Sequence, residues 1–223
     1  MKLFAVKAVP TVNWSSSHPL NFKPASNTLF LLCLGLTLFG LGEALMIAAG
    51  FGVSPWIVLS QGIAEISDIS IGLTTFFVSA VVLLLWIPLK QTPGLGTLLN
   101  ALIIAVVIDY SLPWLPYPQA FIFKGLECVA GIIMVGFGSA IYLMAHLGPG
   151  PRDGLMTGVQ RVTQYPIARV RTSIEIVVVV LGFFLGGTVG LGTFLFAFTI
   201  GPSVSAGLFV VSKLSNSGTD DEG

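Results

Sequence analysis

Residues 28–55 read TLFLLCLGLTLFGLGEALMIAAGFGVSP, and this stretch decides the class of fold. Its first 22 residues contain a single charge, Glu43, and are long enough to cross a bilayer as a helix, which takes about 20 residues. The Gly-rich residues 50–54 then end that helix. Pro55 suits the first turn of a following helix, where a missing N–H costs nothing. The stretch therefore predicts a membrane-spanning helix, a break and a second helix.

The rest of the chain has the same apolar character. Of its 223 residues, 54% are hydrophobic and 9% are charged, and the mean hydropathy is +0.93. A soluble domain carries about 25% charged residues, so lipid must be the solvent for most of this chain. We predict an all-α integral membrane protein surrounded by the lipid bilayer. No nucleic-acid partner is expected, because no cluster of Lys and Arg could hold a phosphate backbone.

Six segments are long enough to span a membrane, and two shorter ones are not. The predicted spans are residues 28–49, 70–89, 95–112, 121–147, 172–187 and 191–211. The shorter segments are residues 55–66 and 151–164. Each follows a Gly-rich break and begins with proline, so both are predicted to be half-helices that do not cross.

The distribution of basic residues predicts the topology. With the N-terminus in the cytoplasm and six crossings, nine of the ten Lys and Arg fall on the cytoplasmic side, and only Lys124 lies outside. Eight crossings would spoil this segregation. We therefore predict a multi-pass protein with a cytoplasmic N-terminal tail, residues 1–27. The C-terminal tail, residues 212–223, is predicted to be cytoplasmic and disordered.

The sequence also contains an internal repeat. GLGEALMIAAGFG at 40–52 and GSAIYLMAHLGPG at 138–150 share the pattern G-x4-L-M-x3-G-x-G at an offset of 138 − 40 = 98 residues. GLGT at 94–97 recurs at 190–193, an offset of 190 − 94 = 96. Three spans in each repeat place the two halves upside down relative to each other. We predict a 3+3 inverted repeat, residues 28–112 and 113–211, which is an architecture of many secondary transporters.

Two motifs resemble a known family. The run LGLTLFGLGEALMIAAGFGVSPWIVLSQGIA and the motif LGPGPRDGLMTG are similar to the bacterial YczE membrane proteins, within a YczE/YyaS/YitT grouping. The resemblance covers about residues 29–211. It implies the fold and a place in the bacterial cytoplasmic (inner) membrane. It supplies no catalytic residue.

The two breaks are candidate binding sites, because each is followed by a helix start. A helix start presents unpaired N–H groups and a partial positive charge, which attract anions. If both starts lie in the interior, they form a site for a small polar or anionic group, with Arg152 as a fixed charge. The alternative is that the glycines only allow close packing and turns, and that Asp153 is only a favourable dipole partner or a cap of its helix. The predicted substrate-binding residues are Glu43, Gly50, Gly52, Ser54, Gly148, Gly150, Arg152 and Asp153.

Glu43 lies in the middle of the first span. An ionised, unpaired carboxylate costs several kcal/mol in hydrocarbon, so Glu43 must face the interior, pair with a base or carry a proton. On one interpretation Glu43 contacts the substrate or couples protons. On the other it makes a buried hydrogen bond that stabilises the packing of the helices.

Arg171 and Glu175 are one helical turn apart. They are interpreted either as a local ion pair near the cytoplasmic surface or as a gate that contacts the half-helix carrying Arg152 and Asp153.

These features favour a secondary transporter of a small polar or anionic solute. The alternative is a non-transporting membrane protein that supports or regulates a partner. An enzyme is not expected, since no nucleophile–base pair, metal-ligand spacing or nucleotide-binding loop is present, and no cofactor is expected. The identity of the solute, the coupling ion and whether the chain forms a homo-oligomer are left open by the sequence.

Overall fold

A computed structural model of the chain describes residues 9–217, and within that range every regular element is helical. Eight α-helices and one 3-10 turn, η1, follow one another along the chain. Their bounds are α1 Ser26–Ala49, α2 Pro55–Ser67, α3 Ile71–Leu85, α4 Leu95–Ser111, η1 Leu112–Trp114, α5 Phe121–Met144, α6 Pro151–Thr163, α7 Ile167–Phe184 and α8 Leu191–Ser217.

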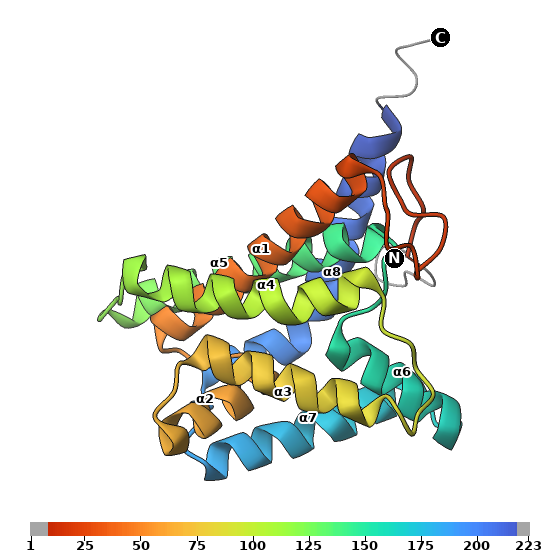
Figure 1. The fold of residues 1–223 in the computed structure, drawn as a ribbon. Coiled ribbons are helices and arrows are strands. Elements are labelled where there is room, and N and C mark those ends of the chain that lie inside the picture. The colour runs from red at the N-terminus through yellow and green to blue at the C-terminus, as the bar shows by residue number, and fades with distance from the viewer. Residues whose placement is uncertain (1–8, 218–223) are drawn as a thin grey trace.

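The helices form two layers (Figure 1). One layer contains α1, α4, α5 and α8, which pack through the pairs α1–α5, α1–α4 and α5–α8. The other contains α2, α3, α6 and α7, which pack through α2–α7, α2–α3, α3–α6 and α6–α7. Each half of the sequence supplies two helices to each layer, so the halves are interlocked rather than side by side.

Four helices are long and apolar enough to cross a membrane: α1, α4 continued by η1, α5 and α8. The pair α2 and α3 passes the same test together but is bent by 114°, and counting it as one span gives five. Helix α3 ends at Leu85, short of the predicted residue 89, and α7 carries Arg169, Arg171 and Glu175. The chain is therefore an all-α membrane protein with four to five spans by length and composition, and six spans stays a prediction.

Glycines let α1 and α5 pack with their backbones in contact. A Cβ on Gly42 would lie 2.6 Å from the carbonyl oxygen of Gly131, and a Cβ on Gly138 would lie 2.6 Å from that of Gly35. Any larger residue would push the helices apart, which is why small residues mark helix contacts in membranes. The first half of α1 contacts the last half of α5, and the last half of α1 contacts the first half of α5, so the two helices are antiparallel.

The two helix breaks have matching backbones. In break one, residues 50–54, Gly50 and Gly52 have φ of 57° and 113°; in break two, residues 145–150, His146 and Gly148 have φ of 53° and 105°. The matching positions are 148 − 52 = 96 residues apart, the same offset as the GLGT turns. The predicted pairing of Gly50 with Gly148 and of Gly52 with Gly150 is thus two residues out of register. The sequence pairing aligned the two Gly-x-Gly motifs with each other. In break two, however, His146 has the first left-handed φ, so Gly148 corresponds to Gly52 rather than to Gly50.

Each break docks on the GLGT turn of the other half of the chain. Gly192 N donates to the carbonyl of Phe51 at 2.8 Å, and Gly96 N donates to that of Leu147 at 2.7 Å. These bonds satisfy carbonyls of residues within the breaks, which lie outside any helix. The breaks are therefore fixed, specific structures.

The N-terminal segment, residues 9–25, lies against the end of α5. The Ser15 hydroxyl donates to the carbonyl of Met144 at 2.6 Å, and Ser16 N donates to that of Ala145 at 3.0 Å. Trp14 is buried beside them. At the other terminus α8 continues to Ser217, so residues 212–217, predicted to be disordered, are helical. Residues 1–8 and 218–223 of the predicted tails lie outside the described residues.

Candidate functional site

A cavity of about 210 Å³ lies where the two breaks approach each other. Both short helices begin at its wall, because their N-cap residues Ser54 and Gly150 line it. Long helices complete the lining. The polar and charged residues that face the cavity are Glu43, Ser54, Asn100, Ser139, Tyr142, Arg152, Asp153, Arg171 and Glu175.

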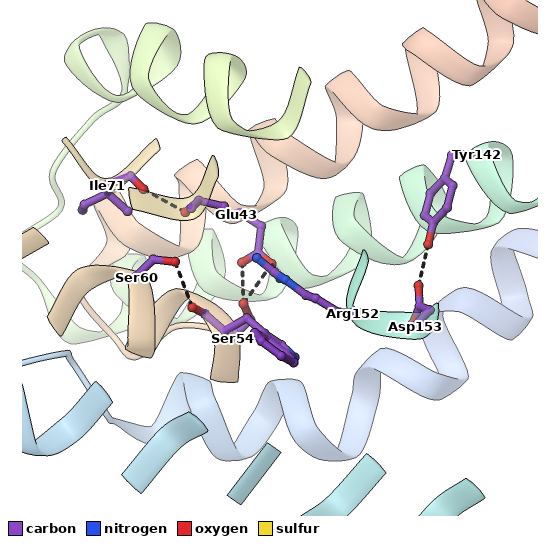
Figure 2. A network of polar contacts seen from close by, with 9 residues as sticks. Glu43, Ser54, Ser60, Ile71, Tyr142, Arg152 and Asp153 are labelled. Carbon is purple, nitrogen blue, oxygen red and sulfur yellow. Dashed lines mark hydrogen bonds and ion pairs between the residues drawn. The ribbon is translucent and has the colours of Figure 1, made fainter. Parts of the chain in front are cut away.

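Glu43 is fully buried within α1, and its carboxylate faces this cavity. The hydroxyl of Ser54 lies 2.8 Å from Oε1 and 2.9 Å from Oε2 and donates to the carboxylate (Figure 2). Ser54 is the N-cap of α2, but its side chain bonds Glu43 instead of its own helix. The positive end of α2 and a hydroxyl donor thus both stabilise the buried acid.

Arg152 reaches Glu43 from the second residue of α6 (Figure 2). Its Nη1 lies 3.8 Å from Glu43 Oε1, which is an ion pair but too long for a hydrogen bond. Its guanidinium carbon lies 5.5 Å above the ring of Trp56, a cation–π contact. Among the described residues the guanidinium makes no hydrogen bond, and 17% of the side chain is exposed. Its N–H donors are therefore available to a ligand in the cavity.

Asp153 bonds a residue of another helix. It lies in the first turn of α6, yet its Oδ2 accepts a hydrogen bond from the hydroxyl of Tyr142 at 2.7 Å. That contact ties the start of α6 to α5 across the cavity (Figure 2). The side chain therefore bonds another helix and does not cap α6, whereas its place in the first turn agrees with the interpretation as a dipole partner.

Arg171 and Glu175 line the edge of the cavity on α7. Arg171 Nε donates to Glu175 Oε1 at 2.9 Å, and the side chains are 44% and 20% exposed. The local ion pair is therefore confirmed. No hydrogen bond or ion pair joins either residue to Arg152 or Asp153 among the described residues, and the gating role stays a prediction.

The predicted glycines divide into two groups. Gly150 lines the cavity, but Gly50, Gly52 and Gly148 do not. A Cβ on Gly52 would lie 2.8 Å from Gly190 N, so that glycine is needed for docking of the GLGT turn. At Gly52 and Gly148 the structure supports the packing alternative over direct contact with a solute, whereas Gly50 has no close neighbour and a left-handed φ of 57°, which serves the turn.

Four lining residues with polar groups are absent from the sequence prediction. Asn100 faces the cavity and makes no hydrogen bond among the described residues. Trp56 is buried under Arg152, and its Nε1 has no partner within the described part of the chain. Ser139 and Tyr142 on α5 carried no signal of their own. Pairing residues 96 apart would have found Ser139, which corresponds to Glu43.

That correspondence holds around the cavity. Glu43 and Ser139 are 96 residues apart and both line it, and so do the pairs Trp56 with Arg152 and Ile104 with Ile200. Within each of the first two pairs the chemistry differs. The two charges that meet in the cavity, Glu43 and Arg152, come from positions that are not equivalent.

The profile of the family of unknown function DUF6198 matches residues 26–207. The chain belongs to this family. All the lining residues of the cavity lie inside the part that DUF6198 covers.

Individual DUF6198-like relatives span most of the chain. An uncharacterized protein of Haemophilus influenzae is 42% identical over 209 residues, which cover 94% of this chain and 95% of that protein. The uncharacterized membrane protein YczE of Bacillus subtilis is 28% identical over 174 residues, 78% of each chain. YyaS of the same organism is 27% identical over 169 residues, 73% of this chain and 83% of its own.

These relatives confirm the YczE-like resemblance of the sequence motifs. The description of YczE as a membrane protein agrees with the apolar helices of this chain. No solved structure matches the chain.

Proposed function

We propose that this DUF6198 protein is a secondary transporter of a small polar or anionic solute in the bacterial cytoplasmic membrane. The single observation that carries the proposal is the meeting of Glu43 and Arg152 in a cavity bounded by the starts of two short helices. Ionisable groups inside a membrane protein are costly and mark solute or ion pathways, and helix starts at the membrane midplane are typical of transporter sites.

The proposed architecture is six spans in a 3+3 inverted repeat with both termini in the cytoplasm. The antiparallel packing of α1 and α5 supports it, as do the backbones of the two breaks, which match at the offset of 96 residues. The reciprocal docking of each break on the opposite GLGT turn is the contact expected of a pseudo-two-fold axis in the membrane plane. Helices α3 and α7 would then be the short spans, with Arg169 and Arg171 at the cytoplasmic end of α7.

Solute flux in proteoliposomes tests the proposal. The wild-type protein is expected to accumulate at least one solute from a panel of amino acids, carboxylates, sugars and inorganic anions under a proton or sodium gradient. Glu43→Gln and Arg152→Ala are expected to lower the accumulation at least about tenfold, because each removes one charge of the central pair.

Two matched variants control for the loss of any acid or base. Glu65→Gln and Arg169→Ala change exposed residues outside the cavity and are expected to leave the flux within about twofold. No flux of any solute under any gradient would overturn the proposal. A stable co-purifying protein in that case would favour the alternative of a membrane protein that supports a partner.

A further inference from the structure

The charges around the cavity restrict what it can bind. Three carboxylates and two guanidinium groups line it, so the lining has a net charge of −1 when all are ionised. These are Glu43, Asp153 and Glu175 with Arg152 and Arg171. An anion that enters alone would change this to −2 in a partly buried space, where like charges repel more strongly than in bulk water.

The carboxylate of Glu43 and an incoming anion compete for the same group. Within the described residues, Glu43 is the only acid with an oxygen within 4.0 Å of an Arg152 nitrogen. At 3.8 Å the pair is loose, so Arg152 has unused donors on the edge of its guanidinium plane while Trp56 covers its face. A planar carboxylate accepts two parallel hydrogen bonds from such an edge.

Protonation of Glu43 would remove the competition. The other charged and titratable groups that face this cavity are Arg152 and Asp153 on α6, Tyr142 on α5, and Arg171 and Glu175 on α7. Asp153 already accepts from Tyr142, and Glu175 already accepts from Arg171. Glu43 is the acid whose only cationic partner would have to be shared with the ligand.

We infer that the cavity binds a small monocarboxylate on Arg152 together with one proton on Glu43. The proton comes from water and forms an O–H bond on the Glu43 carboxylate, while Arg152 stays charged and bonds the ligand's carboxylate. One negative charge replaces another, so the net charge of the lining and ligand does not change. Asn100 and Ser139 face the same space with polar groups that make no hydrogen bond among the described residues, and they can bond the rest of the ligand. This inference rests on the proposed function and names its solute class and coupling ion as a monocarboxylate and a proton.

Binding to the full-length protein in detergent tests the inference without any flux. The probes are acetate and benzoate as monocarboxylates, malonate as a dicarboxylate and benzamide as a neutral analogue. Binding is measured by the rise in melting temperature, and proton uptake by an indicator dye in weakly buffered solution. At least one monocarboxylate is expected to bind with uptake of about one proton. Its Kd should then increase by up to about tenfold for each unit by which the pH is raised. Malonate and benzamide are expected to bind at least about tenfold more weakly.

Two variants separate Glu43 from the other acids. Glu43→Gln keeps the shape of a protonated acid, so it is expected to bind the monocarboxylate with no proton uptake and with a Kd that does not change with pH. The matched control Glu65→Gln removes an exposed acid outside the cavity, so it leaves the charge of the lining unchanged and is expected to keep an uptake of about one proton. Arg152→Gln in the Glu43→Gln background leaves no unpaired charge at this pair, and it is expected to melt normally but to lose binding.

Three results would overturn the inference: no binding of either monocarboxylate, binding without proton uptake, or proton uptake that persists in Glu43→Gln. Its failure can be told apart from that of the proposed function. Flux of another solute without proton-linked binding would support the transporter and refute the monocarboxylate ligand. Proton-linked binding without flux in proteoliposomes would support this ligand and refute the transporter.

Discussion

Break one and break two follow the same path and then differ in the residue after the proline. Trp56 follows Pro55, whereas Arg152 follows Pro151, and the N-caps before them are Ser54 and Gly150. Break one thus presents a hydroxyl and an aromatic face to the cavity, and break two presents a cation. The comparison teaches that the repeated backbone builds the cavity, while the chemistry lies in the positions where the halves no longer match.

Removal of the cation should have the largest effect on stability. Arg152→Ala leaves Glu43 buried without its only ion-pair partner, and breaking a buried pair costs about 3–5 kcal/mol. Trp56→Ala, at the equivalent position of break one, leaves Glu43 paired and provides the comparison. Equilibrium unfolding in detergent with added SDS gives both values at one pH. A smaller loss for Arg152→Ala than for Glu43→Gln with Arg152→Ala would contradict the idea that the two charges depend on each other.

The next largest effect is expected from the serine that break two lacks. Ser54→Ala removes the donor to a buried carboxylate and should lower the free energy of unfolding by about 1.5–3 kcal/mol. Ser60→Ala removes a buried serine of the same helix that bonds only the carbonyl of Trp56, and should cost about 0.5–1.5 kcal/mol. Equal losses of unfolding free energy in the same assay would mean that the bond from Ser54 to the carboxylate stabilises the protein no more than an ordinary hydroxyl–carbonyl bond.

The two equivalent glycines should respond alike. Gly52 and Gly148 have φ of 113° and 105°, and a Cβ on either would lie 2.8 Å from an atom of the opposite GLGT turn. Gly52→Ala and Gly148→Ala are each expected to cost about 1–3 kcal/mol through backbone strain, with additional loss from the overlap. Melting temperatures measured side by side check this. A large difference between the two variants would break the equivalence of the breaks.

The smallest effect is expected where break two has His146 and break one has Gly50. His146 has φ of 53°, which costs a residue with a Cβ about 1 kcal/mol. His146→Gly should therefore raise the free energy of unfolding by up to about 1 kcal/mol, reduced by the loss of its long contact with the carbonyl of Pro10. Gly50→Ala should lower it by a similar amount, because Gly50 has a φ of 57° and the nearest atom to an added Cβ, Lys124 Nζ, would be 4.0 Å away, too far to overlap. The same sign of change in both variants would contradict this account.

The sequence predicted the end of α1, the start of α2 and the central charges, because each has a strong local signal. Gly50 and Pro55 end and start helices by their backbone chemistry, and Glu43 must face the interior because of what its charge costs in lipid. The register of the repeat at the breaks was predicted wrongly, because Gly-x-Gly fits two alignments two residues apart. The GLGT turns are 96 residues apart in the sequence, and the φ of His146 shows that the breaks follow that same offset.

The positions of uncharged residues were harder to predict, because burying them in the protein or exposing them to lipid costs little free energy. A tryptophan is stable both at a membrane surface and beneath a guanidinium, so the sequence could not say that Trp56 is buried. The N-terminal segment was predicted as a tail because its residues are polar. Its place depends on carbonyls at the end of α5, a helix that begins about a hundred residues later in the chain.

The distance in sequence between Glu43 and Arg152 has a consequence for biosynthesis. The ribosome adds about 5–20 residues per second, so Glu43 emerges about 5–20 s before the arginine that will pair with it. During that time α1 lacks its partner α5, although it contains an acid whose burial in hydrocarbon is costly. The nascent first half is thus an intermediate in which water, lipid headgroups or an insertion factor must solvate Glu43 until the second half is synthesised.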